Sequence, residues 1–439
     1  MQNKLRNRCG ILSARLQLSV FSTLTLATLT VTNGQQVLIA PPTIPAEPQA
    51  TEQTGDTNQV AGGSGAVSVS SGAILHNKNP FQWGPVVLHP HLGYGFNYST
   101  GLQSQPGQAS KSVVNTLSPG IGLDLGQHWV LGYTAGATFY SDPKFKNTVD
   151  HNISLAGHTT YEDWGFNLSQ SVAISSDPIV ETAQQTDQQT YSTSFGTSYQ
   201  ITSDLSAELT AGQELHSSQG TSKVITNSIG SSSDWSLSGA LNYQLGPGVS
   251  TGLGVGFGYS KVGIGSDMTY ENVNGQFNWQ FARKFSLSVN GGLQIRQFLG
   301  SGQSSLISPS FGVGLNYHPF DFTAISLSAS RGISPSFFQN QVTESTSVNL
   351  GVSQRLFRHY YLSLNGGYGL TSYQDAIPGN TTVFHGREDT RSFFGANLST
   401  SFLKRGTASL SYSKSQNSSN SSGYGYTSDQ IGFSVAYSY

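Results

Sequence analysis

The final ten residues, QIGFSVAYSY (430–439), alternate strictly between bulky apolar side chains and small or polar ones. The bulky parity consists of Ile431, Phe433, Val435, Tyr437 and Tyr439. The other parity carries only Gln, Gly, Ser and Ala. Successive side chains of a β-strand point to opposite faces, so this segment predicts a strand whose two faces meet different environments.

The same alternation recurs from Val86 to the end of the sequence. It is clearest in VVLHPHLGYGFNY (86–98), LGYTAGATFY (131–140), STGLGVGFGYS (250–260), FSLSVNGGLQIRQF (285–298) and YYLSLNGGYGL (360–370). Each segment has about ten residues or more, which is enough for a tilted strand to cross a membrane. The polar face of these segments carries Ser, Gly, Asn, Gln and Thr.

The connections between these segments alternate in length. Short polar or Gly-containing turns are expected at 126–128, 203–204, 246–248, 283–284, 320–321, 358–359 and 404–406. Longer loops are expected at 99–111, 175–189, 217–233, 375–388 and 416–425. Pairing the segments through the short turns gives about 18 strands (16–18), an even number as in bacterial single-chain barrels. The sequence therefore predicts an all-β, antiparallel, transmembrane up-and-down β-barrel.

A soluble fold, such as tandem β-sandwiches or a β-solenoid, would also alternate. Charged residues make up only 10% of the chain, whereas soluble proteins have about 25%. No domain boundary is visible between Val86 and Tyr439. These features favour the membrane barrel, with the apolar parity facing lipid and the polar parity facing the lumen. Trp129, Trp164 and Trp279 lie next to expected short turns and fit an aromatic girdle at the periplasmic interface.

Three regions follow from composition. Residues 1–34 combine basic residues with an apolar run from Leu16 to Val31 and predict a signal peptide; a membrane anchor is the alternative. Residues 35–79, rich in Pro, Gln and Gly, predict a flexible periplasmic linker; the alternative places it inside the barrel. Residues 80–439 form the predicted outer-membrane barrel. The single cysteine, Cys9, lies in the predicted signal peptide, so we expect no disulfide in the mature chain.

Two resemblances point to the Gram-negative envelope. The terminal aromatic with its alternating apolar residues resembles the signature read by the barrel assembly machinery, with Ile431, Phe433, Val435, Tyr437 and Tyr439 as matching residues. From Asn79 onward the chain also resembles the β-barrel porins of type 2. That resemblance is carried by NPFQWGPVVLHPHLGYGFNY (79–98), the strand count and the terminal aromatic. It implies a pore surrounded by the lipid of the bacterial outer membrane, and it transfers no catalytic residue.

The sequence offers no constellation for an enzyme, a cofactor or a metal. His89 and His91 share one face of a strand, but two ligands without an assignable third do not make a metal site. The ten histidines are scattered, and no base, orienting group and nucleophile can be assembled. The net charge of -2 gives no basic patch for nucleic acid.

The expected lumen carries few charges. By parity, the pore-lining residues Asp124, Glu208, Glu214 and Arg296 point inward. Four scattered charges would give only weak charge selectivity; the alternative is that each is a solvated or mutually paired charge without a selectivity role. No loop is long enough to form an obvious plug or deep constriction. The loops around Thr182, Val224 and Val383 are the best candidates to fold inward.

The leading expectation for function is a porin-like channel for passive diffusion of small hydrophilic solutes. One alternative is an export or secretion conduit, for example for polysaccharide, in which residues 35–79 dock a periplasmic partner. A second is a structural or adhesive barrel whose outer loops act while the bore stays blocked. A homotrimer would follow by analogy with porins, but the sequence shows no interface.

Overall fold

The computed structural model describes residues 81–220, 231–262, 267–281, 284–300, 305–336, 341–375 and 386–439. The predicted signal peptide and linker lie outside these ranges, as do the loop positions Val224 and Val383, so those expectations stay predictions. No helix within the described ranges is long and apolar enough to cross a membrane.

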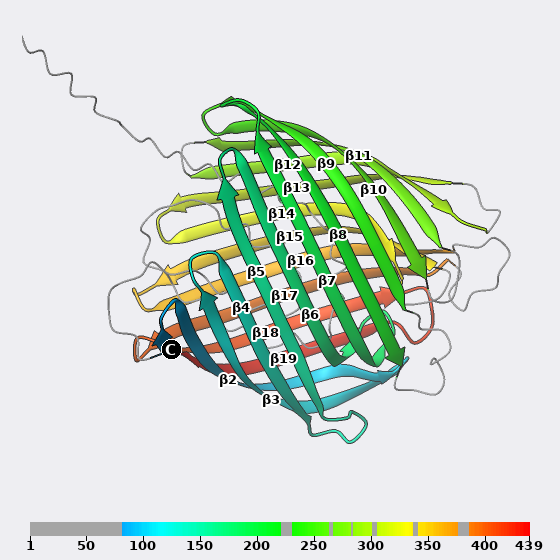
Figure 1. Ribbon diagram of the computed structural model, residues 1–439. Helices are drawn as coiled ribbons and strands as arrows, with labels where there is room; N and C mark the ends of the chain where they lie inside the picture. Colours follow the sequence, from blue (N-terminus) through cyan, green and yellow to red (C-terminus); the bar gives the residue numbers. More distant parts are fainter. Residues whose placement is uncertain are drawn as a thin grey trace, which may run out of the picture.

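The described chain forms one closed antiparallel barrel (Figure 1). Each strand from β2 to β19 pairs with its neighbours in sequence, and β19 returns to pair with β2, so the barrel has 18 strands. A short additional strand, β1 (Gln82–Trp83), pairs with the start of β2. The fold class predicted from alternation is confirmed, including the even strand number.

The barrel strands are β2 (Val86–Gln105), β3 (Gln108–Leu125), β4 (Trp129–Tyr140), β5 (Thr148–Tyr161), β6 (Trp164–Ile179), β7 (Gln184–Gln200), β8 (Leu205–Gly220), β9 (Ser232–Gly246), β10 (Val249–Val262), β11 (Met268–Phe281), β12 (Phe285–Phe298), β13 (Leu306–Phe320), β14 (Thr323–Pro335), β15 (Gln341–Leu356), β16 (Tyr360–Asp375), β17 (Glu388–Phe402), β18 (Gly406–Ser419) and β19 (Tyr426–Ser438). Two or three residues separate β3 from β4, β9 from β10, β15 from β16 and β17 from β18. We call the end with these tight connections the turn end, and the opposite end the loop end.

The outer face of the barrel is a continuous apolar surface. On β10, Leu253, Val255 and Phe257 are 72%, 61% and 51% exposed, while the glycines between them face the lumen. The same holds on β19, where Ile431 and Phe433 are exposed. Water does not tolerate so much contiguous apolar surface, whereas hydrocarbon requires it together with a sheet that has no free edge. The barrel therefore has the surface of a transmembrane protein.

Aromatic rings border this apolar surface on both sides. Trp129, Trp164 and Trp279 lie beside tight connections at the turn end, with partly exposed rings. On β9, Trp235 near the loop end and Tyr243 near the turn end are eight positions apart (243 minus 235). At about 3.4 Å per residue this is about 27 Å along the strand, or about 20 Å across a membrane for a strand tilted by about 40°. That height is close to the apolar band of known barrels, which is about 25 Å.

The last strand lies as the sequence predicts. β19 pairs with β2 from Gln430↔Ser99 to Ser438↔His91 and thereby closes the barrel. Its bulky parity faces outward, and the ring of Tyr439 packs edge-on against Phe81 at 4.7 Å between centroids. Recognition of this strand by the assembly machinery stays a prediction.

Two expected loops are mostly strand. β2 continues to Gln105 and β3 begins at Gln108. In the same way, β6 continues to Ile179 and β7 begins at Gln184. The ladder extends beyond the apolar band, where strands no longer need apolar side chains on one face. Alternation therefore marks only the part of each strand that meets lipid, and it underestimates the strand length at the loop end.

Candidate functional site

The tip of the β6–β7 hairpin (residues 178–186) is folded into the barrel. A hairpin tip at the loop end would be exposed if it pointed away from the membrane, yet Thr182, Ala183 and Gln184 have no exposed surface. The inward position agrees with the expectation for the loop around Thr182. The expectation that no loop is long enough for an obvious plug or deep constriction stays a prediction; the two strands themselves carry the tip inward.

Local bonding closes the tip. The Thr182 and Thr186 hydroxyl oxygens lie 3.0 Å apart, and the Thr182 hydroxyl also donates to the Gln184 carbonyl at 3.3 Å. Ala183 takes a positive φ of 52°, which allows the chain to reverse within four residues. The tip therefore satisfies some of its own polar groups, as burial requires.

An apolar contact holds the tip against a distant wall. Val180 packs in a buried cluster with Leu102 of β2, Val114 of β3, Phe145 of the β4–β5 connection and Tyr426 of β19. β6 is four strands away from β2 around the barrel, and none of these partners lies on β6 or β7. The tip therefore leans across the interior to the wall where β19 meets β2.

A pair of hydrogen bonds ties the hairpin to the β4–β5 connection. The Gln185 side-chain amide donates to the Lys146 carbonyl at 3.0 Å, and the Lys146 backbone N–H donates to Gln185 Oε1 at 3.0 Å. A third bond runs from the same amide to the Ser176 carbonyl at 2.9 Å. Gln185 is 3% exposed, so these bonds are shielded from water.

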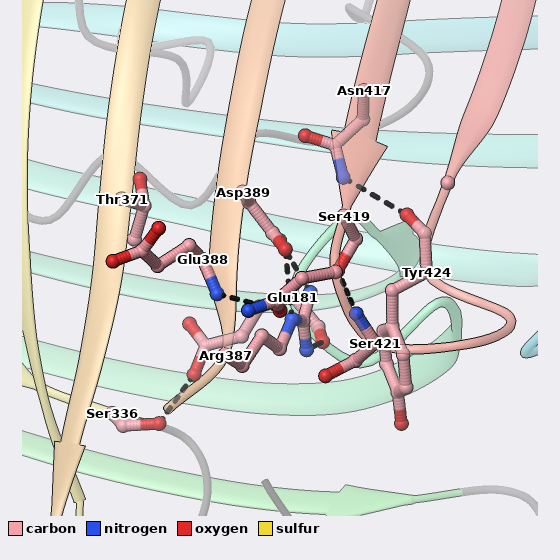
Figure 2. A network of polar contacts seen from close by, with 12 residues as sticks. Glu181, Ser336, Thr371, Arg387, Glu388, Asp389, Asn417, Ser419, Ser421 and Tyr424 are labelled. Atoms are coloured by element: carbon pink, nitrogen blue, oxygen red, sulfur yellow. Dashed lines mark hydrogen bonds and ion pairs between the residues drawn. The ribbon is translucent and has the colours of Figure 1, made fainter. Parts of the chain in front are cut away.

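Arg387, immediately before β17, binds the hairpin tip from the other side (Figure 2). Its Nη1 donates to the Glu181 carbonyl at 2.9 Å. Its Nε and Nη2 form a two-pronged ion pair with the Asp389 carboxylate at 3.0 and 2.5 Å. Arg387 has no exposed surface, and Asp389 is 5% exposed. The pair is therefore charge-assisted, geometrically specific and dry.

Two tyrosine rings complete the environment of Arg387. The guanidinium carbon lies 4.4 Å from the ring centroid of Tyr373 and 3.9 Å from that of Tyr424. Both distances fit cation–π contacts. Burial and the surrounding carboxylates raise the pKa of Tyr424 to about 12 against the opposing effect of Arg387, so this phenol stays neutral at physiological pH. We refer to Arg387, Asp389, Tyr373, Tyr424 and Glu181 as the latch.

The charge of Arg387 is secure despite its burial. Burial alone lowers the pKa of the guanidinium, but the hydrogen bonds to Asp389 and the nearby acidic groups outweigh this effect and raise the pKa above its usual value. Arg387 therefore keeps its positive charge in the latch over the whole physiological pH range.

The end of β14 also reaches the hairpin tip. The Ser336 hydroxyl donates to Glu181 Oε1 at 2.6 Å. Beyond Arg331, β14 no longer pairs with β13, although it continues to pair with β15. The freed carbonyl of Ile333 accepts a hydrogen bond from Arg296 Nη2 of β12 at 3.0 Å, so this end of β14 leans into the barrel.

Three segments thus meet inside the loop end: the β6–β7 tip, the end of β14 and the residue that precedes β17. They come from separate parts of the wall, and Glu181 and Arg387 are 206 residues apart in sequence. Their meeting narrows the bore at the loop end. This constriction is the candidate functional site.

The four predicted pore-lining residues lie at three different levels of the barrel. Asp124 is near the turn end, where its Oδ2 lies 3.0 Å from His89 Nε2. Glu214 lies opposite Asp234 near the loop end. Arg296 stacks over the ring of Tyr270 at 5.3 Å and is 4% exposed, and the Tyr270 hydroxyl donates to Asp234 at 2.8 Å.

Glu208 lies between these levels, opposite Ala240 on β9. The structure brings Glu214 and Arg296 into one chain of contacts through Asp234 and Tyr270, and it leaves Asp124 and Glu208 apart. A role of these four residues in ion selectivity stays a prediction.

Sequence reasoning missed the latch. Arg387, Asp389 and Tyr424 lie in or next to loops and follow no periodic pattern. One signal was present: Ile179 and Val180 are adjacent apolar residues within an otherwise polar loop, which points to a buried tip.

The paired histidines do not converge on a common ligand. His89 Nδ1 lies 3.3 Å from the Tyr439 carbonyl, whereas His91 Nε2 lies 3.1 Å from the Thr134 hydroxyl. In the part of the chain that the structure describes, no group of three or more His, Cys, Asp or Glu side chains is arranged to hold a metal.

No protein-family model matches the chain, and no curated protein matches it. Solved structures do resemble it. OccAB4 from Acinetobacter baumannii is 10% identical and covers 83% of this chain and 100% of its own, with a TM-score of 0.43. The outer membrane protein OpdK from Pseudomonas aeruginosa is 10% identical over 80% of this chain and 98% of its own, with a TM-score of 0.43.

A third match is the siderophore receptor PirA from Pseudomonas aeruginosa. It is 9% identical over 79% of this chain and 80% of its own, with a TM-score of 0.40. At such identities and TM-scores these likenesses transfer neither a family nor a solute to the chain.

Proposed function

We propose that the chain is an outer-membrane channel for passive diffusion of small hydrophilic solutes. The observation that carries the proposal is the closed barrel of 18 strands with an apolar outer face and a lumen of hydroxyls, amides and glycines. Barrels of about this strand number leave a water-filled bore. A wall that offers hydrogen bonds to water keeps that bore hydrated.

The constriction sets the size of solute that passes. The β6–β7 tip occupies the interior at the loop end, and the latch fixes its position. Solutes must therefore pass between this tip and the remaining wall, so the position of the tip determines the exclusion limit.

Charge selectivity is weak in this proposal because several of the inner charged groups have a partner. Asp389 pairs with Arg387, Asp124 lies beside His89, and Arg296 lies in one chain of contacts with Asp234. Selectivity for ions requires a ring of like charges that face the permeating solute. A paired charge contributes little net field to the bore.

The proposed relationship to β-barrel porins of type 2 is supported by the strand count and by the terminal strand that closes the barrel on β2. It would make the outer membrane the location of the chain and the assembly machinery its partner during insertion. Whether three barrels associate would be tested by cross-linking in detergent, where a trimer band supports the porin analogy and a monomer alone contradicts it.

Ion conductance in planar lipid bilayers tests the proposed function. We expect stepwise conductance after insertion of the purified barrel, and a reversal potential close to zero across a KCl gradient because the lumen has little net charge. Compact migration of the unboiled sample on a denaturing gel verifies folding. A folded, inserted barrel that passes no current would show a scaffold rather than a channel.

A further inference from the structure

Strand β11 carries a column of amides along the lumen. Val273, Phe277 and Trp279 are exposed on its outer face, so the alternate positions face inward. From the loop end to the turn end these inward positions are Asn272, Asn274, Gln276, Asn278 and Gln280. Five consecutive inward amides give a polar group about every 7 Å, since two residues of a strand span that distance.

The neighbouring strand β10 has glycines opposite the amides of this column. Its inward positions Gly252, Gly254 and Gly256 pair in register with Gln276, Asn274 and Asn272. A Cβ atom on Gly254 would lie 2.6 Å from Asn274 Oδ1, and one on Gly256 would lie 2.5 Å from Asn272 Oδ1. These glycines are therefore needed for the amides to lie along the wall without obstructing the bore.

The amides retain unused hydrogen-bonding capacity. Gln276 donates to Asn242 on β9. No hydrogen bond joins the side-chain amides of Asn272, Asn274 or Asn278 to another described residue, and these three side chains are partly exposed to the lumen. Each amide offers two N–H donors and a carbonyl acceptor. In the absence of a solute these groups bind water.

The wall around the column is uncharged. Over β9 to β12, the lumen-facing residues between the level of Asp234 and Arg296 and the turn end are Ser, Gly, Ala, Asn and Gln only. Such a surface offers hydrogen-bond donors and acceptors and has no charged side chain of its own, although Glu208 of the adjacent strand β8 hydrogen-bonds Asn242 at its edge. It matches a solute with the same properties, which is a neutral molecule rich in hydroxyl groups.

We propose that this amide column is a binding track for neutral polyhydroxylated solutes, of which short oligosaccharides are the simplest class. The track rests on the proposed channel function and specifies its solute. A bound hydroxyl exchanges one amide for the next along β11, so an equivalent hydrogen bond forms as the previous one breaks. Binding at every step stays weak enough to allow release, as conduction requires.

Block of ion current by a neutral oligosaccharide tests the track. The probe is maltohexaose, added to the wild-type channel in planar bilayers, and the size control is polyethylene glycol of the same hydrodynamic radius, which lacks hydroxyl donors along its chain. We expect saturable block by maltohexaose at concentrations where polyethylene glycol has little effect. Equal block by both polymers would overturn the proposal, because size alone would then explain it.

A double variant, Asn272→Ala with Asn274→Ala, removes two amides that bind no other described residue, so folding should be retained. We expect its half-blocking concentration of maltohexaose to rise about tenfold, in line with two neutral hydrogen bonds. Asn365→Ala is the matched control, since Asn365 is an inward amide that lies against a glycine, Gly395, on the wall of β16 and β17.

Maltohexaose should block the current through Asn365→Ala at the same half-blocking concentration as in the wild type. An unchanged half-blocking concentration in the double variant would also overturn the track. Either outcome against the track would leave the ion current measured without sugar unchanged. Failure of the proposed channel function is different, because a folded barrel would then carry no current at all.

Discussion

Replacing Arg387 with Ala is expected to release the β6–β7 tip and widen the bore. The substitution removes the two-pronged ion pair with Asp389, the hydrogen bond to the Glu181 carbonyl and both cation–π contacts. Removing one partner of a buried ion pair costs about 3–5 kcal/mol, because the other charge is left buried without compensation. The Glu181 carbonyl loses its partner in Arg387, so part of this cost falls on the closed position of the hairpin.

The measurement is single-channel conductance together with the exclusion limit for neutral polymers in liposome swelling. We expect both to rise in Arg387→Ala. Arg387→Lys keeps the charge but cannot reproduce the two-pronged geometry, so it should lie between the wild type and the Ala variant.

Lys414→Ala is a suitable control for the latch variant. Lys414 pairs with Asp429 at 3.5 Å, but both side chains are about half exposed (54% and 42%). Exposed ion pairs contribute about 0–1 kcal/mol, so this variant should conduct like the wild type. If folded Arg387→Ala keeps both the wild-type conductance and the wild-type exclusion limit, then Arg387 does not hold the constriction.

Placing Arg on the outer face should destabilise the barrel strongly. Val255 is 61% exposed in the middle of β10 and faces lipid in the proposed membrane. Arg at the bilayer midplane costs about 2–4 kcal/mol in barrels of this kind. Equilibrium unfolding by guanidinium from lipid vesicles should therefore show a lower free energy of unfolding for Val255→Arg, and Leu364→Arg should behave similarly.

The matched control places Arg on the inner face. Ser363→Arg is the better choice, because Ser363 faces the lumen next to Leu364. Gly256→Arg is unsuitable, since even a Cβ atom there would meet Asn272. A hydrated lumen accepts the charge, so the free energy of unfolding of Ser363→Arg should stay close to that of the wild type. Equal destabilisation at Val255 and Ser363 would contradict the assigned faces.

The barrel itself could be predicted because the side chains that produce it alternate regularly along the sequence. Every strand that crosses lipid must alternate, as Leu253, Val255 and Phe257 do on β10, and every tight turn needs polar or Gly residues. The segment HNISLAGHTTYED (151–163) alternates only faintly, yet most of it belongs to strand β5. The strand number and the outward parity of the last strand follow from the same pattern.

The constriction could not be predicted in this way because its contacts are local in space and distant in sequence. Val180 meets Leu102 and Tyr426, and Glu181 meets Ser336 and Arg387. Nothing in the periodicity of one segment fixes which distant loop it contacts. The amide column could be predicted in part. The sequence shows that its amides share one face of the strand, but the glycines of β10 that lie against them can be identified only once the register of β10 and β11 is known.

The accessibility of single cysteines to a membrane-impermeant thiol reagent is the most direct test of the assigned faces. The only cysteine of the sequence, Cys9, lies in the predicted signal peptide, so the mature chain allows one thiol at a time to be placed at the neighbouring positions Ser363 and Leu364. In liposomes, Ser363→Cys should react through the water-filled lumen, and Leu364→Cys should be protected by lipid. Rapid reaction at Leu364 with protection at Ser363, or equal reaction at both, would contradict an aqueous bore enclosed by a lipid-facing barrel.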